Sequence, residues 1–568
     1  MKLNFIDQLG DWNPQLLREL KGRLKPRNLL IAGAISLLSQ FLLFMFWQNQ
    51  LPILYKAPLN SMILNKYCIA SDDGYGYYHD CHPDALGNFL INWQLWWLDL
   101  FVCLSVIGIF ALLVAGTHML ISDLANEQRR DTLNFIRLSP ESTQSILVGK
   151  LLGVPILLYF VAVLAAPLHL WSGLSAGIPL GQILGFYAVV FASGILFYSV
   201  ALLYGLVSKW LGGFQIWLGS GMVLVFLVIA TALTGVPINN PLAWSRLLCP
   251  FDLIPHLSAS SFYQHAHQEL EQLQWFYLPL GASVSIQLSV ALLNCCFWTY
   301  WIWQGLNRCF RNPQATILSK WQSYLLTACF EVTIVGFASP GWATEAYTSP
   351  KNSLFENLVS LSLLNLLLFL CLIAALSPHR QVLQDWSRYR REGVFTRKGF
   401  WNRALVQDLI WNEKSPALAA IAWNLAIATV PMVAWILLLP AQGVDKITAL
   451  FALACNACLI MIYAAITQLM LFMKTQNREF WAAGTLGAAI FLPPLILGVL
   501  SISPDKNIGL WLFSAFAPVA LTSANASATT VFLALLGQWS ILVLLTLRLN
   551  RQLRQAGESG SKKLLSNS

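Results

Sequence analysis

Long apolar runs recur along this 568-residue chain from Asn28 to near its C-terminus. A helix of about 20 apolar residues crosses the hydrocarbon core of a bilayer, whereas a β-barrel would show alternating segments of about 10 residues. Hydrophobic residues make up 57% of the chain and charged residues 11%. The sequence therefore predicts an all-α polytopic membrane protein with about 12 transmembrane helices. We expect them near residues 28–48, 93–121, 151–171, 182–207, 214–235, 278–303, 323–338, 354–377, 417–439, 447–473, 480–502 and 528–547.

Lysine and arginine are distributed unevenly between the two sides of this topology. With the N-terminus in the cytoplasm, the cytoplasmic segments hold 29 of the 35 lysines and arginines, and the outer segments hold 6. Cytoplasmic loops of membrane proteins carry such an excess. The pattern predicts a multi-pass protein of the plasma (inner) membrane with both termini cytoplasmic. It also accounts for the net charge of +9, so no nucleic-acid partner is expected.

The residues before the first apolar run predict an N-terminal amphipathic interfacial helix that ends before Pro26. Four leucines recur at helical spacing, while four cations fall largely elsewhere on the helix. These residues are Leu16, Leu17, Leu20 and Leu24, and Arg18, Lys21, Arg23 and Lys25. The alternative is a solvated basic tail that obeys the charge bias.

Two short sequence patterns occur twice. WNPQLLREL (Trp12–Leu20) precedes the first predicted span and WNRALVQDL (Trp401–Leu409) precedes the ninth. LNRCFR (Leu306–Arg311) follows the sixth span and LNRQLR (Leu549–Arg554) follows the last. The patterns frame two units, the second of them shorter. We expect a six-span unit over residues 1–311, a two-span connecting region with a basic cytoplasmic segment over 312–400, and a shortened second unit over 401–568.

A polar stretch, residues 124–150, separates two of the most apolar runs. Asp123 can cap a helix that extends to about Leu138, and within it Glu127 and Arg130 lie one turn apart and can form an ion pair. At Ser139-Pro140 the residues favour a new helix that continues into the third span. A rigid cytoplasmic helix over 123–138 is suited to transmit a push from a soluble partner. The alternative is an ordinary solvated loop.

This stretch resembles the cytoplasmic loop of ABC-2 type transporter permeases. The matching residues are Glu-x-Arg-Arg-x-Thr-Leu at 127–133, Leu-Ser-Pro at 138–140 and Gly-Lys at 149–150, with Asp131 where the family usually has glycine. In that family the loop forms a coupling helix that rests in a groove of the ATP-binding subunit. The resemblance is good over residues 1–311 and makes 401–568 a shortened permease-like unit. It implies that the ATPase-subunit docking residues are Glu127, Arg129, Arg130, Thr132, Leu133 and Phe135.

The resemblance implies the transmembrane permease subunit of an ATP-driven exporter. The chain has no Gly-x-x-x-x-Gly-Lys-Ser/Thr phosphate loop, so we do not expect it to be an enzyme. No cofactor is expected in this chain, and ATP and Mg would be bound by a separate ATP-binding subunit. Full transporters of this type need two six-span halves. We therefore expect a second permease copy as well as membrane lipid as partners, the alternative being one chain that works asymmetrically.

Four further residues have chemistry of their own. Cys68 and Cys81 can form a disulfide in the first outer loop, where no spacing of ligands fits a metal site. Asp99 and Glu331 are acidic residues in or near predicted spans, where charge is costly and suggests a functional or pairing role. The alternative function is therefore an ATP-independent secondary transporter or channel, in which Glu331 or Asp99 binds a coupling ion.

Overall fold

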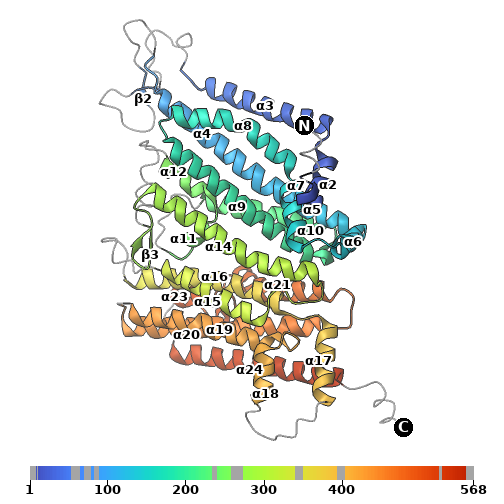
Figure 1. Cartoon of the computed structure of the whole chain (residues 1–568). Helices are drawn as coiled ribbons and strands as arrows, with labels where there is room; N and C mark the ends of the chain where they lie inside the picture. The colour runs from blue at the N-terminus through green and yellow to red at the C-terminus, as the bar shows by residue number, and fades with distance from the viewer. Residues whose placement is uncertain are drawn as a thin grey trace. The chain divides into compact units, whose positions relative to one another are not determined.

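The computed structural model is almost entirely helical (Figure 1). It describes residues 8, 10–52, 64–69, 79–81, 89–232, 240–257, 273–338, 350–392, 403–439, 441–523 and 527–557.

Among these residues, 11 helices are long and apolar enough to cross a membrane, which agrees with the predicted all-α polytopic class. They are α3 (Pro26–Gln48), the continuous helix of α4 (Trp93–Phe110), η2 (Ala111–Ala115) and α5 (Gly116–Arg129), α8 (Ile156–Ser175), α9 (Leu180–Val207), α10 (Phe214–Ala232), α14 (Val284–Arg311), α16 (Pro350–Leu376), α19 (Ala417–Leu438), α20 (Gly443–Leu471), α21 (Arg478–Val499) and α24 (Ala528–Ala556). The seventh predicted span corresponds to α15 (Lys320–Gly336), whose 17 residues are too few for this set.

The chain forms two compact units. The first contains Met1–Pro237, Ser245–Leu273 and Pro279–Trp303, and the second contains Ile238–Trp244, Gln274–Leu278 and Gln304–Ser568. The region 312–400, predicted to be a separate connection, lies within the second unit. There α15 and α16 both pack against α19, and α16 also packs against α20.

In the first unit, short elements stand at opposite ends of the long helices (Figure 1). At one end α2 (Pro14–Arg23) packs against α7 (Thr143–Gly153), beside α6 (Thr132–Leu138). At the other end β1 (Leu64–Asn65) pairs with β2 (His79–Asp80). Between them α8 packs against α3 and α4, and α5 packs against α9. The main core includes Phe101, Ile183 and Leu227, on α4, α9 and α10, together with residues of η4 (Pro250–Leu253) and α12 (Ile254–Leu257).

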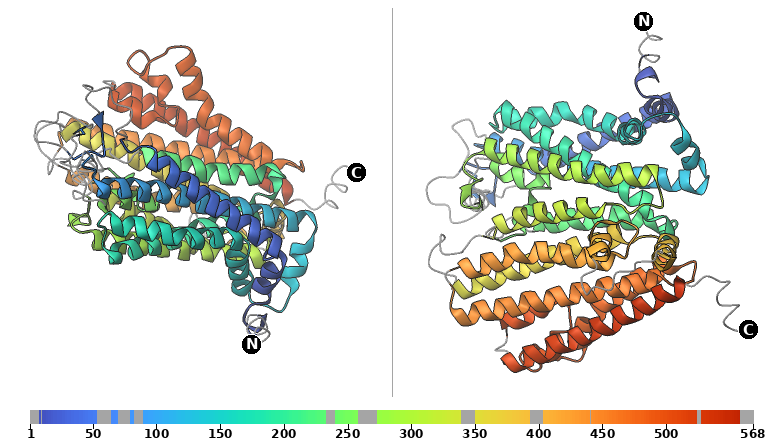
Figure 2. Two further views of the ribbon diagram at one scale, coloured as in Figure 1. Left: turned by 90° about the horizontal axis from the view of Figure 1, so that it is seen from above. Right: turned by 60° about the horizontal axis from the view of Figure 1, so that its bottom comes forward.

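In the second unit, α20 packs against α19, α21 and α24. The orange and red ribbons of α19, α20 and α24 can be followed in Figures 1 and 2. The remaining helices are short. They are α17 (Arg380–Glu392), which packs against α24, α18 (Arg403–Trp411), which packs against α19, α22 (Ile508–Trp511) and α23 (Ala517–Ser523).

The helix boundaries around the polar stretch differ from those predicted. The second span continues without a break through Arg129, so Asp123 lies inside α5 and caps no helix. The chain turns at Asp131, whose φ of 54° is left-handed, and α6 then starts at Thr132. The next helix begins at Thr143, capped by Ser142, and not at Ser139-Pro140. It also ends at Gly153, so α7 and the span α8 are separate helices.

A disulfide joins Cys68 to Cys81, with Cα atoms 5.2 Å apart. It adjoins the β1–β2 hairpin, and the backbone of Cys68 forms an isolated bridge to Ile91, just before α4. The disulfide therefore joins the described parts of this long loop close to the helix that follows it.

The cation distribution predicts that this loop lies outside the cell, where the partly exposed Cys81 should let an applied reductant reach the disulfide although Cys68 is buried. We expect a membrane-impermeant maleimide to label two additional thiols on intact cells only after an impermeant reductant is applied. The Cys68→Ala, Cys81→Ala variant should gain none. Labelling that requires permeabilised cells would instead show that the predicted orientation is reversed. Mass shifts of the purified chain measure both outcomes.

Candidate functional site

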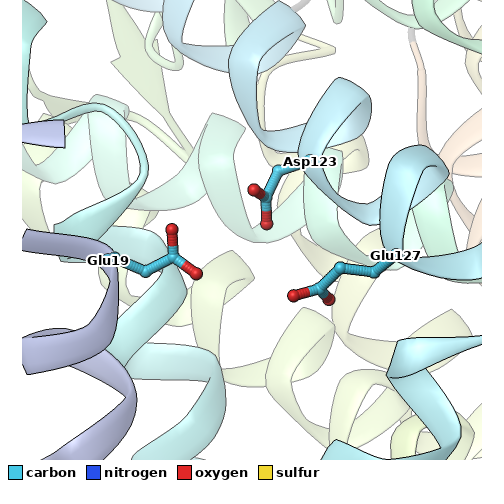
Figure 3. Close-up of side chains that lie close together, drawn as sticks. All are labelled: Glu19, Asp123 and Glu127. Atoms are coloured by element: carbon cyan, nitrogen blue, oxygen red, sulfur yellow. The ribbon is translucent and has the colours of Figure 1, made fainter. Parts of the chain in front are cut away.

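The side chain of Lys150, on α7, is fully buried and lies among three carboxylates. Its Nζ is 2.8 Å from Asp123 Oδ2, 2.8 Å from Glu127 Oε2 and 4.0 Å from Glu19 Oε1. Glu19 belongs to α2, whereas Asp123 and Glu127 lie one turn apart on α5, and Figure 3 shows the three carboxylates converging. We call these four residues the charge cluster. It joins α2 to α5 and α7, which come much later in the sequence.

Two arginines of α2 complete the charge balance. Arg23 donates from Nη2 to Asp123 Oδ1 at 2.7 Å and lies 3.2 Å from Glu19 Oε2, while Arg18 lies 3.2 Å from Glu127 Oε1. Three anions are thus matched by three cations. A buried ion pair is stable only when every charge is compensated in this way.

The three carboxylates could also be considered as ligands of a metal ion, since one oxygen from each lies within 4.8 Å of the others. The Lys150 ammonium, however, already contacts Asp123 and Glu127 at hydrogen-bonding distance. The charge cluster is therefore compensated by its own lysine and does not require a metal.

Close packing of α2 on α7 places the charge cluster. Asn13 caps α2, because its Oδ1 accepts from Leu16 N at 2.8 Å while its Nδ2 donates to Ser145 O, just before Lys150 on α7. A Cβ added at Gly149 would lie 2.7 Å from Asn13 Oδ1, and one at Gly153 would lie 2.5 Å from Glu19 Cβ. The two glycines therefore let the helices approach until Glu19 reaches the lysine.

The α2 helix buries its polar side in the protein. Asn13, Gln15 and Glu19 are buried, and Leu16 is the one buried leucine of the predicted four. Leu17 and Leu20 are partly exposed and Leu24 is exposed. This arrangement leaves an apolar side available to the membrane, as an interfacial helix requires.

Beyond the charge cluster, α6 presents a different surface. Leu133 and Ile136 are buried, whereas Phe135 is 76% exposed and Leu138 is 84% exposed. Asn134 lies beside Phe135 and is exposed as well. We call the two exposed apolar side chains, Phe135 and Leu138, the α6 tip. Large apolar side chains exposed to this degree on a short helix are suited to contact another protein.

The predicted docking residues divide between these two regions. Glu127 is buried and pairs with Lys150 and Arg18, so the predicted pairing with Arg130 is wrong. Leu133 is also buried, and Thr132 Oγ1 donates to the backbone oxygen of Glu127.

Arg129, Arg130 and Phe135 are exposed. Arg129 donates to Asn126 Oδ1 at 3.1 Å. The sequence analysis did not predict a functional role for Glu19 or Leu138. Both nevertheless stand in segments that it identified, Glu19 in the repeated nine-residue pattern and Leu138 in the Leu-Ser-Pro match.

The predicted intramembrane acid Asp99 has partners at the end of the first unit that carries the hairpin. Its Oδ2 is 2.7 Å from Lys66 Nζ and accepts a 2.8 Å hydrogen bond from Tyr67. Trp96, one turn earlier on α4, donates to the backbone oxygen of Trp47 on α3. Asp99 thus has a structural role, in which it fixes the loop that contains the disulfide.

The predicted acid Glu331, on α15, is fully buried in the second unit. Asn365 Nδ2 lies 3.5 Å from its Oε2, while its Oε1 has no hydrogen-bond partner among the described residues. Thr327, one turn earlier, donates to Asn424 at 2.8 Å. One side of α15 therefore buries a row of polar groups against α16 and α19.

Comparison with protein-family models, curated proteins and solved structures finds no match to this chain.

The charge cluster predicts a large loss of stability for Lys150→Met. This variant leaves the buried carboxylates of Glu19 and Glu127, and the partly exposed one of Asp123, without their central cation. Removing one partner of a buried ion pair costs about 3–5 kcal/mol. We expect a clearly lower apparent melting temperature of the detergent-solubilised protein, measured by the fluorescence of its tryptophans. Adding Asp123→Asn and Glu127→Gln to the same chain should restore much of the loss.

Arg18→Gln is the matched control, because the Arg18 side chain is 54% exposed. An exposed pair contributes about 1 kcal/mol or less. Equal melting temperatures for Lys150→Met and the wild type would show that the charge cluster does not hold these helices together.

Proposed function

We propose that this chain is the permease subunit of an ATP-driven ABC-2 type exporter and that a separate ATP-binding subunit docks on the α6 tip. The observation that carries the proposal is that α6 exposes two apolar side chains while the end of α5, directly before it, is fixed by buried ion pairs. Phe135 and Leu138 are exposed on α6, and Glu127, five residues before Thr132, is locked to Lys150. A solvated loop needs neither feature.

The chemistry of α6 indicates what it would contact. Phe135 and Leu138 would enter an apolar groove, because removing apolar surface from water is the main favourable contribution to most protein association. Arg129 and Arg130 are exposed just before α6. An acidic rim around the groove would therefore complement the helix and accelerate the encounter of the two subunits.

The charge cluster provides a route by which a movement of α6 would reach the membrane. Through Lys150 and Glu19, the base of α6 is joined to α7 and α2. The helix α2 leads into α3, and α7 is followed by α8, both of them candidate spans. A displacement of docked α6 would thus be passed to two spans at once.

In the exporter proposal the separate ATP-binding subunit binds ATP and Mg, since this sequence contains no phosphate loop. It also includes a second permease copy in the inner membrane, because the matching segment 127–133 occurs once in this chain.

Ion-coupled transport is the second candidate, and the surroundings of Glu331 favour it. A fully buried carboxyl group, one oxygen of which has no hydrogen-bond partner in the part of the chain that the structure describes, is the kind of group that takes up a proton or a cation. In this alternative Glu331 is the coupling residue, and α6 has no partner.

Substitution of the α6 tip tests the exporter proposal. We expect Phe135→Ser with Leu138→Ser to abolish co-purification of an ATP-hydrolysing subunit from native membranes while the permease remains folded and inserted. Both side chains are exposed, so the change should cost little stability. Asn134→Ser, on the same helix, is the control and should retain the partner. Unchanged ATPase activity in the double variant would contradict docking at this surface.

Glu331→Gln separates the two candidates. Glutamine keeps the shape and a hydrogen bond to Asn365 but cannot exchange a proton. An exporter should keep ATP-dependent transport in this variant, whereas an ion-coupled transporter should lose gradient-driven transport. Transport assays in vesicles, with ATP or with a proton gradient as the sole energy source, measure the difference.

A further inference from the structure

A cavity of about 470 Å³ lies in the first unit between α4, η2, α8 and α9. These helices run side by side in Figure 1. Most of its lining is aliphatic or aromatic, and no lining residue is Asp, Glu, Lys or Arg. Val163 on α8 is 68% exposed and Phe191 on α9 is 62% exposed, so the cavity has an apolar rim.

Three polar side chains of this cavity, Ser105, His169 and Tyr187, form one hydrogen-bonded chain. Ser105 Oγ donates to Phe101 O at 2.8 Å, so its proton is already used. His169 Nε2, 2.7 Å from Ser105 Oγ, must then be the donor of that pair. Burial disfavours a charged imidazolium, and Nδ1 of the neutral ring is then an acceptor to which Tyr187 donates at 2.8 Å. Both ring nitrogens are thus satisfied inside the protein.

The two other tyrosines of the lining also direct their protons to the backbone. Tyr198 donates to Leu112 O at 2.7 Å, and Tyr159 donates to Leu151 O at 3.0 Å. With the chain through His169, every side-chain donor named here is occupied. What the tyrosine oxygens still offer are lone pairs, so the cavity can accept a hydrogen bond but has no free donor to give.

The wall near Tyr198 has an unusual backbone. Leu112 lies in η2, a π-helical turn within the second span, and such turns are frequent at functional sites. Gly116 follows directly, and a Cβ there would lie 2.2 Å from the Tyr198 hydroxyl oxygen. The glycine thus lets the Tyr198 ring lie flat against the helix, where it forms part of the cavity wall.

We propose that this cavity binds a neutral, long-chain alcohol from the membrane, with its hydroxyl donating to a tyrosine oxygen. The volume falls in the roughly 300–1,000 Å³ range typical of small-molecule sites. The apolar lining excludes a charged head group because burying an unpaired charge is costly. The exposed rim of Val163 and Phe191 gives the molecule a route from the hydrocarbon phase. This site requires no ATP-binding subunit and is independent of the proposed exporter function.

Photo-crosslinking with matched probes tests the proposal on the full chain in lipid nanodiscs. The probes are hexadecanol carrying a diazirine on its chain, its methyl ether and the corresponding carboxylate. We expect the alcohol to label peptides of α8 and α9. Labelling by the methyl ether should be about fivefold weaker, as expected for one lost hydrogen bond, and labelling by the carboxylate weaker still.

Cavity-filling variants locate the binding. Gly194 and Gly108 line the cavity, and an added Cβ at either position would meet no atom within 4 Å. Gly194→Phe should reduce alcohol labelling about tenfold or more, and Gly108→Phe should do the same. Gly221→Phe is the matched control, because this glycine of α10 also has free space but does not line the cavity.

The melting temperature of each variant shows whether it is folded. Because two positions fill the cavity independently, the test still holds if one of the two variants fails to fold. Equal labelling by the alcohol and the carboxylate, or undiminished labelling in both folded cavity variants, would overturn the proposal.

Discussion

The ammonium of Lys150 holds together three carboxylates that would otherwise repel one another in a buried place. They come from α2 and α5, and the lysine comes from α7. The interaction therefore links three helices at the end of the unit that is predicted to face the cytoplasm. Other features of this region depend on it. The two glycines of α7 permit the approach, the polar side of α2 faces inward to supply Glu19, and α6 stands on a base that cannot rotate freely. Charge compensation therefore accompanies the close packing of these segments.

The second unit also contains a buried lysine that links helices, but its partners are different groups. Its helix α18, which carries the repeated pattern, also lies against a buried lysine. Lys320 Nζ donates to Leu409 O at 2.6 Å and to Ser415 Oγ at 2.5 Å. Here neutral oxygens replace the carboxylates, and Asp408, which matches Glu19 in the pattern, accepts from Trp386. The lysine also comes from α15, which precedes α18, whereas α7 follows α2. The repeated sequence is therefore accompanied by a similar anchoring but not by the same helix order.

Apolar length and periodicity predicted eleven of the twelve expected spans as long apolar helices, because those properties act along one helix and are visible in consecutive residues. The predicted pairing of Glu127 with Arg130 failed because it considered only neighbours on that helix. The actual partners, Lys150 and Arg18, are distant in sequence and are brought near by packing. Asp99 likewise has its partner on a loop, Lys66, which no spacing rule connects to it. The break after Gly153 is marked in the sequence by Pro155 and was missed, whereas the π-helical turn at η2 leaves no distinct pattern in an apolar run.

The left-handed backbone conformation of Asp131 affects the stiffness of the connection between α5 and α6. It joins α5 to α6 with φ 54° and ψ 12°. Glycine adopts this conformation freely, most other residues reach it only at a cost of about 1–2 kcal/mol, and aspartate reaches it more readily than most but less freely than glycine. A glycine there would act as a loose hinge, since neighbouring conformations would have nearly equal energies. With a side chain present, the accessible range of φ and ψ is narrower, and the connection between α5 and α6 is stiffer. A force applied to α6 would then turn the rigid arm as a whole, and little of it would be dissipated by bending at the joint.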